Sequence, residues 1–112
     1  MKARFEVYRS AVGEWFYQLL AADNQVMLRS EAYKTFASCI NGIESCKEHS
    51  PYDRFYNRRD GDSGFTFHLK ASNNKIITLG QESTSADERE KMIGTVKRYA
   101  PSAQITDCIT RR

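Results

Sequence analysis

The chain matches itself when it is shifted by 50 residues, and the match needs no gap. Identical residues recur at this offset in segments typical of strands, turns and helices. They are Arg4-Phe5 with Arg54-Phe55, Leu19 with Leu69, Ala21 with Ala71, Asn24 with Asn74, Ile43 with Ile93, Lys47 with Lys97, and Pro51 with Pro101. A repeat of this length is one supersecondary unit that relies on its neighbour to bury apolar surface. The offset therefore predicts two equivalent units that share a core.

The first copy, about residues 1–52, predicts three strands and a helix. Alternating apolar residues favour strands over residues 4–9, 14–21 and 26–30. Asn24 lies in the second turn, and asparagine tolerates the left-handed backbone that a tight hairpin requires. An apolar stripe at helical spacing predicts a helix over about residues 35–49, which Pro51 ends. The stripe consists of Phe36, Cys39, Ile40, Ile43 and Cys46.

The second copy, about residues 53–112, has the same pattern. We expect strands near residues 54–58, 64–71 and 75–79, with a hairpin turn at 60–64. The second helix begins at Ser85, because Ser85-Ala86-Asp87-Glu88 has the form of a capping box. A last strand spans about residues 104–108. The strand near 53–58 ends the first repeat and also begins the second, so the two repeats share an element.

The predicted fold class is α+β, with two tandem β-β-β-α-β repeats in one mainly antiparallel sheet and two helices packed on one face. No linker rich in proline, glycine or serine separates the repeats. A chain of 112 residues also has room for only one modest core. We therefore expect residues 1–112 to form a single domain.

Three segments of the first copy are distinctive: Ser30-Glu31-Ala32-Tyr33, the run from Cys39 to Lys47, and Gly13-Glu14-Trp15. Through them the chain resembles, over nearly its whole length and most specifically in the first copy, the YegP-like family of small, uncharacterised, mostly bacterial proteins. The resemblance implies one sheet of tandem β(3)-α-β units with exchanged terminal strands, and it implies no activity. Two departures are Asp23-Asn24 and Asn73-Asn74, where the family usually has Asn-Gly. A third is the polar first turn of the second helix.

One face of the predicted sheet is left uncovered by the two helices. If residues such as Phe5, Val7, Tyr17 and Leu19 face the helices, their neighbours along each strand face the other way. The candidate binding residues on this uncovered face are Arg4, Tyr8, Phe16, Gln18, Arg54, Tyr56, Arg58, His68 and Lys70. Tyrosine, phenylalanine and arginine are enriched at protein interfaces, and aromatic rings beside cations also suit nucleic-acid bases and phosphates. A merely solvated face would carry similar residues.

Three functions remain open from the sequence. The first is a non-enzymatic interaction module that binds an unknown protein partner through the uncovered face or an edge strand. The second is a weak binder of single-stranded nucleic acid, resting on Arg4, Arg54, Arg58 and Lys70. The third is an enzyme of unrecognised type, which a carboxylate beside His68 would favour. We expect no catalytic or metal site and no cofactor, because no metal-ligand spacing, nucleophile elbow or phosphate-binding glycine loop is present.

Charge and cysteine usage narrow the setting of the protein. The net charge of +3 is small and partly due to Arg111 and Arg112 at the end of the chain. Three cysteines, Cys39, Cys46 and Cys108, are too few and too irregularly spaced for a disulfide framework. Residues 1–6 contain no long apolar stretch, and no apolar run reaches the roughly 18 residues of a membrane helix. We expect a cytoplasmic protein without a membrane partner, as a monomer or weak homodimer.

Overall fold

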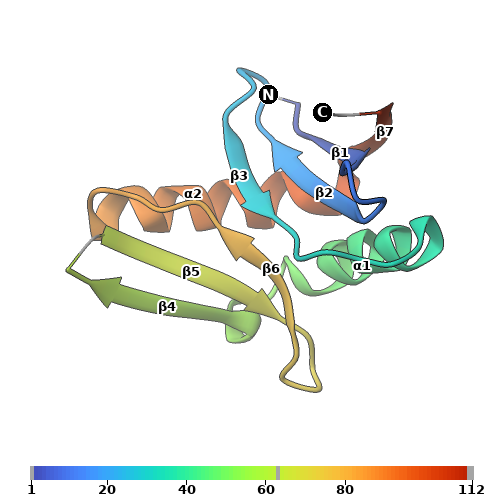
Figure 1. Cartoon of the computed structure of the whole chain (residues 1–112). Coiled ribbons are helices and arrows are strands. Elements are labelled where there is room, and N and C mark those ends of the chain that lie inside the picture. The colour runs from blue at the N-terminus through green and yellow to red at the C-terminus, as the bar shows by residue number, and fades with distance from the viewer. Residues whose placement is uncertain (1, 63, 111–112) are drawn as a thin grey trace.

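The structure contains the predicted elements in the predicted order. The computed structural model describes residues 2–62 and 64–110, with only the backbone for 107–110 (Figure 1). Ser63 of the predicted turn, Arg111, Arg112 and the Cys108 side chain lie outside this description. The strands are β1 (Arg4–Arg9), β2 (Trp15–Leu20), β3 (Val26–Arg29), β4 (Tyr56–Gly61), β5 (Gly64–Lys70), β6 (Ile76–Gly80) and β7 (Gln104–Thr110). The helices are α1 (Phe36–His49) and α2 (Ala86–Tyr99), and short 3-10 turns occupy Asp53–Phe55 and Ala100–Ser102.

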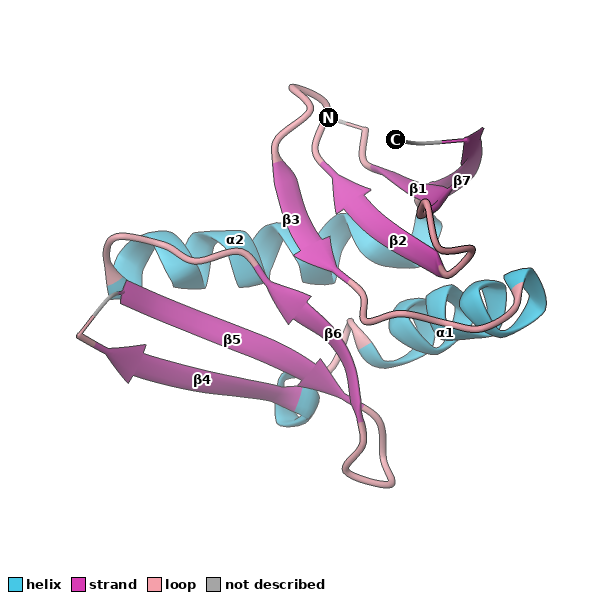
Figure 2. Cartoon of the chain, in the orientation of Figure 1, coloured by secondary structure: helices cyan, strands magenta, loops and turns pink. Residues whose placement is uncertain are grey.

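All seven strands form one sheet in the order β4-β5-β6-β3-β2-β1-β7 (Figure 2). Neighbouring strands are antiparallel except β1 and β7, which are parallel. The two repeats meet in the middle, where β3 of the first pairs with β6 of the second. The mainly antiparallel α+β fold predicted from the repeat is therefore confirmed. The parallel strand β7, from the end of the second repeat, covers the outer edge of the first.

One apolar cluster joins both repeats and both helices. Buried side chains of the strands and helices from both halves belong to it, among them Phe5, Tyr17, Ile43, Leu69 and Ile93. The buried side chains of α1 and of α2 pack against the buried side chains of the strands in this one cluster. The two helices therefore lie on the same face of the sheet. Neither helix, among the residues that the structure describes, is long and apolar enough to cross a membrane.

Local signals set the turns and helix starts as the sequence predicts. Asn24 and Asn74 both have φ 70°, the left-handed conformation expected in their turns. The Ser85 side chain accepts a hydrogen bond from the Glu88 backbone N–H at 3.1 Å, as a capping residue should. The Glu88 carboxylate does not return to Ser85. It accepts instead from the Thr84 hydroxyl at 2.6 Å.

An ion network connects β4 and the 3-10 turn before it to α2. Arg58 of β4 lies 2.8 Å from Glu90 and 2.8 Å from Asp53, and Lys97 lies 2.6 Å from Asp53. Arg89, which is buried on α2, is paired with Asp60 and lies 3.1 Å from Glu90. Arg89 and Glu90 of α2 are equivalent to Cys39 and Ile40 of α1 by the offset of 50 residues. Charged side chains in α2 thus occupy positions that are apolar in α1.

Acid is expected to weaken this network through Asp53. Hydrogen bonds first from Arg58 and then from Lys97 lower the pKa of Asp53 to about 2, from an ordinary value of 3.8. A carboxyl group with a lowered folded-state pKa stabilises the fold above its unfolded pKa, and this contribution is lost as the pH falls from about 4 to about 2. We expect Asp53→Asn to cost less than about 1 kcal/mol at neutral pH, because the side chain is exposed.

The measurement is urea unfolding of wild type and Asp53→Asn at several pH values between about 2 and 7. The difference between the two should be largest near neutrality and vanish at the acid end. A constant difference over the whole range would show that Asp53 does not act through its charge.

Candidate functional site

The sheet surface away from the helices is the best candidate for a site, and we term it the open face. Side chains alternate along each strand, so the neighbours of the buried inward residues lie on it. It consists of Arg4, Glu6, Tyr8, Phe16, Gln18, Arg29, Asn57, Arg59, Thr66, His68, Lys70 and Leu79. Six of the nine predicted binding residues are therefore brought together here, namely Arg4, Tyr8, Phe16, Gln18, His68 and Lys70.

An aromatic pair marks the β1–β2 part of the open face. Tyr8 and Phe16 are directly paired across the two strands. Their rings are stacked, with centroids 5.5 Å apart and planes 14° from parallel, and both side chains are partly exposed. Aromatic rings that are held rigidly at a surface lose little side-chain entropy when a partner covers them. This pair is therefore suited to anchor an apolar group.

The cations of the open face outnumber its carboxylates. Arg4 is neutralised by Glu6, from which it lies 3.0 Å, and it also donates to Asn24 at 2.6 Å. Arg29, Arg59 and Lys70 form no ion pair with any other residue that the structure describes. The open face consequently carries positive charge that no carboxylate among the described residues pairs with.

His68 lies between these cations. It is paired with Asn57 across β4 and β5, and the two side chains approach to 3.1 Å. The pKa of His68 is lowered, first by partial burial and then by the nearby charges of Arg59 and Lys70. Its polar partner is an amide and its charged neighbours are cations. Among the described residues, no carboxylate is therefore placed to support general acid–base chemistry at this histidine.

The structure moves three predicted residues off the open face. Tyr56 is buried on the helix side, where its hydroxyl donates to the Ser50 carbonyl at 2.7 Å. Arg58 is engaged by Asp53 and Glu90 on the same side. Arg54 precedes β4 and stacks over the rings of Tyr52 and Phe55 at 5.1 and 4.5 Å. The prediction that these three residues line the open face is wrong.

The reason is a register shift of one residue between the repeats. Phe5 pairs with Leu19 in the first half, but Tyr56, not Phe55, pairs with the equivalent Leu69 in the second. Phe55 remains in the 3-10 turn, with its ring 4.6 Å from that of His49 at the end of α1. Because side chains alternate with a period of two, a shift of one residue sends every side chain of β4 to the opposite face.

Four residues of the open face were not expected there from the sequence, namely Arg29, Asn57, Arg59 and Leu79. The other two, Glu6 and Thr66, follow from the same alternation as the six predicted residues. Asn57 and Arg59 can be placed once the pairing of Gly61 with Gly64 is known, since alternation then puts them opposite His68 and Thr66. Arg29 and Leu79 follow from alternation with the buried residues that precede them. The offset of 50 residues would place Phe55 opposite Leu69, whereas Tyr56 lies there, so the offset predicts the wrong register for this strand.

The described residues offer little to nucleophilic or metal chemistry. Burial raises the pKa of Cys39 to about 11 and that of Cys46 to about 12. Both thiols are free and protonated at neutral pH, and a thiol must ionise to act as a nucleophile. Within residues 2–62 and 64–106, whose side chains the structure describes, no three side chains of histidine, cysteine, aspartate or glutamate are grouped to hold a metal ion.

The edge strand β4 is a weaker candidate than the open face. Among the described strands it pairs only with β5, and all its residues after Tyr56 are exposed. These residues include Arg58, Arg59 and Asp60. Charged side chains on an edge strand oppose the addition of another strand, so β4 resembles a protected edge.

The chain is similar to proteins of unknown function over nearly its whole length. A family model described as domain of unknown function DUF1508 matches it twice, over residues 10–56 and 60–107. A UPF0339 protein encoded in the region 5′ of the ptx operon of Stutzerimonas stutzeri is 38% identical, covering 96% of this chain and 97% of that protein. The UPF0339 protein YegP of Escherichia coli K12 is 32% identical, covering 96% and 98%.

Two solution NMR structures have the same fold. The UPF0339 protein SO3888 of Shewanella oneidensis superposes with a TM-score of 0.91 at 29% identity, covering 97% of this chain and 93% of that one. The E. coli protein yegP, described as of unknown function, also superposes with a TM-score of 0.91, at 31% identity and with 100% and 97% covered.

Proposed function

We propose that this chain, which belongs to the YegP-like (UPF0339) family of uncharacterised bacterial proteins, is a non-enzymatic interaction module whose open face binds an acidic protein partner. The observation that carries the proposal is the stacked Tyr8–Phe16 pair on an uncovered face that also holds uncompensated cations. Aromatic residues and arginine are enriched among the residues that contribute most of the binding energy at protein interfaces. The buried thiols support a reducing, cytoplasmic setting.

Charge complementarity selects the kind of partner. Arg29, Arg59 and Lys70 lie on three different strands. Partial burial, and then the charges of Arg59 and Lys70, lower the pKa of the nearby His68. Carboxylates on a partner would meet these cations while an apolar side chain packed on Tyr8 and Phe16. Binding of nucleic acid is less favoured, because two of the four cations expected to contact phosphates do not lie on the open face. Arg58 is paired with two carboxylates, and Arg54 stacks on aromatic rings before β4.

Charge reversal on the open face tests the proposal. We expect Arg29→Glu/Arg59→Glu, and separately Phe16→Ala, to reduce retention of acidic proteins from a nuclease-treated bacterial lysate by about 10-fold or more. Lys34→Glu/Lys75→Glu is the matched control, since both lysines are exposed and lie outside the open face. Retained proteins are identified and quantified by mass spectrometry, and circular dichroism checks that each variant is folded.

Two outcomes would overturn the proposal. One is a set of retained proteins that is the same for the open-face variants as for the control. The other is retention that disappears on nuclease treatment, together with binding of an oligothymidylate that weakens steeply with salt, which would assign the face to nucleic acid instead.

A further inference from the structure

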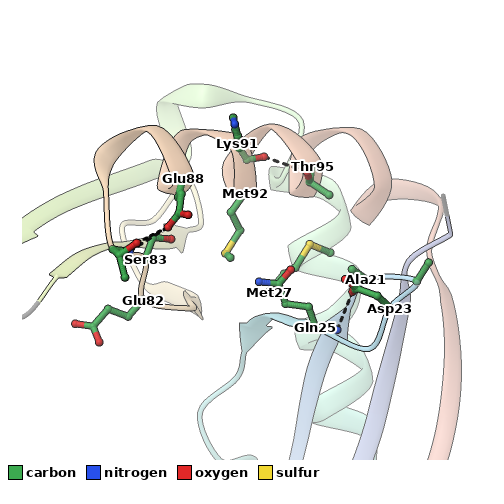
Figure 3. Close-up of a pocket in the computed structure, with 12 residues that line it drawn as sticks. Ala21, Asp23, Gln25, Met27, Glu82, Ser83, Glu88, Lys91, Met92 and Thr95 are labelled. Atoms are coloured by element: carbon green, nitrogen blue, oxygen red, sulfur yellow. Dashed lines mark hydrogen bonds between the residues drawn. The ribbon is translucent and has the colours of Figure 1, made fainter.

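A cavity of about 560 Å³ opens on the helix side of the molecule, away from the open face (Figure 3). It lies between the β2–β3 turn of the first half and the start of α2 in the second. Its volume is in the range of small-molecule sites in proteins. The cavity belongs to neither repeat alone, so a molecule bound there would touch both.

Two methionines form the apolar part of this cavity. Met27 of β3 is 2% exposed, and Met92 of α2 is partly buried. In Figure 3 the two side chains extend from opposite sides into the same hollow. Thioethers are flexible and make favourable contacts with aromatic rings, so this pair can adapt to a flat ring between them.

The repeat shows what the first half puts in the equivalent place. Tyr33 and Ser83 are equivalent, because Tyr33 bridges to Trp15 as Ser83 bridges to Phe65. In the first half the Tyr33 ring packs so closely on Gly42 that a Cβ there would lie 2.6 Å from its Cζ atom.

Gly42 and Met92 are equivalent, because they are separated by the repeat offset of 50 residues. In the second half a serine and a methionine therefore replace the ring and the glycine, and both of them line the cavity. The cavity lies where the first half places a phenol ring.

The rim of the cavity is acidic. Asp23, Glu82 and Glu88 line it, against the single cation Lys91. The Asp23 carboxylate accepts from the Gln25 backbone N–H at 3.0 Å, and hydrogen bonds from Thr84 lower the pKa of Glu88. The Glu88 carboxylate is therefore ionised at neutral pH. With three carboxyl side chains along it, the rim favours a positive charge on a bound molecule.

We propose that this cavity binds a small organic cation that carries an aromatic ring. The ring lies between Met27 and Met92, in the place equivalent to the Tyr33 ring, and the cationic group lies at the rim near Asp23 and Glu82. The site is independent of the open face, so each can be tested without the other.

Tyramine is the probe, because it combines a phenol ring with an ammonium group. Two matched compounds separate the contributions: 4-ethylphenol has the ring without charge, and 3-(4-hydroxyphenyl)propionate has the opposite charge. In titrations of the ¹⁵N-labelled chain of residues 1–112 at low salt, tyramine should shift amide signals of residues 21–27 and 82–95. Its affinity should exceed that of 4-ethylphenol by about 5-fold or more, and the propionate should bind more weakly than either.

Two variants test the named contacts. Ser83→Tyr/Met92→Gly installs the pair that the first half carries and should abolish the tyramine shifts. Asp23→Asn/Glu82→Gln changes only exposed side chains, so it keeps the test available if the first variant does not fold. This variant should bind tyramine about 5-fold more weakly and should bind 4-ethylphenol with unchanged affinity. The proposal is overturned if tyramine causes no shifts up to about 10 mM, shifts other residues, or binds no better than the propionate.

Discussion

Replacement of Gly80 by alanine is expected to destabilise the protein by about 3 kcal/mol. A Cβ at this position would meet three atoms of the Phe67 ring, and the most distant of them, Cδ1, would be only 2.6 Å away. Phe67 is 2% exposed and packs beside Tyr56, with ring centroids 5.8 Å apart, so its ring has no free space to move into. Overpacking of a rigid core must then be relieved by a shift of the sheet itself.

Thermal and urea unfolding would measure this effect, and Gly94→Ala is the matched control. Gly94 lies in α2, and an added Cβ there would have no neighbour within 4 Å. Alanine is the better helix former, so the control should gain up to about 1 kcal/mol while Gly80→Ala loses about 10 °C or more in Tm. If both variants shifted in the same direction, contact with Phe67 would not be the cause.

A double variant isolates that contact. Phe67→Leu removes the ring edge that the new Cβ would strike. Combined with Gly80→Ala, it should cost at least about 1 kcal/mol less than the sum of the two single changes. Simple additivity would mean that Gly80 is required for some reason other than the Phe67 ring.

Neither half of the chain is expected to fold as a monomer. A fragment of residues 1–52 would lose β7 from the edge of β1 and β6 from the edge of β3. Its α1 would also lose contacts with the second half, including the hydrogen bond from the Ser72 backbone N–H to His49 at 3.3 Å. Much of the shared apolar cluster would be exposed to water, and a chain of this size has little stability to spare.

Circular dichroism and ¹⁵N spectra of the fragments 1–52 and 53–112 would test this, together with sedimentation at two concentrations. We expect unfolded spectra for each fragment alone and a folded spectrum when the two are mixed. A fragment that folds only as a dimer would also agree with a core shared by two repeats. In such a dimer, the equivalent strands of two copies can pair as β3 and β6 do in the intact chain. A folded monomeric half would contradict the single-domain interpretation.

Much of the fold follows from short-range patterns in the sequence. The boundaries of β1, β2, β3, α1 and α2 agree with the predictions within one or two residues, since alternation, helical spacing and caps act over a few residues. The left-handed asparagines Asn24 and Asn74 were equally predictable. The open face was predictable on β1 and β2 for the same reason.

The prediction for β4 failed at a point where a distant contact overrides the local pattern. Residues 54–58 alternate as the first strand does, and they repeat its Arg-Phe pair. In the structure Phe55 stays in the 3-10 turn, with its ring on that of His49 at the end of α1, and the strand begins after it at Tyr56. No pattern within the strand reports where that helix ends in space.

By itself, the sequence determined that two similar units form one α+β sheet and which residues turn, cap and alternate, because these properties depend on neighbours along the chain. Only the tertiary structure decided the register of β4, the set of cations on the open face and the cavity between Met27 and Met92. Each of these depends on how one repeat packs against the other, and small differences at equivalent positions, such as Tyr33 and Ser83, then have unequal effects. The similarity of the two repeats can be read from the sequence, whereas the structural differences between them arise from tertiary packing.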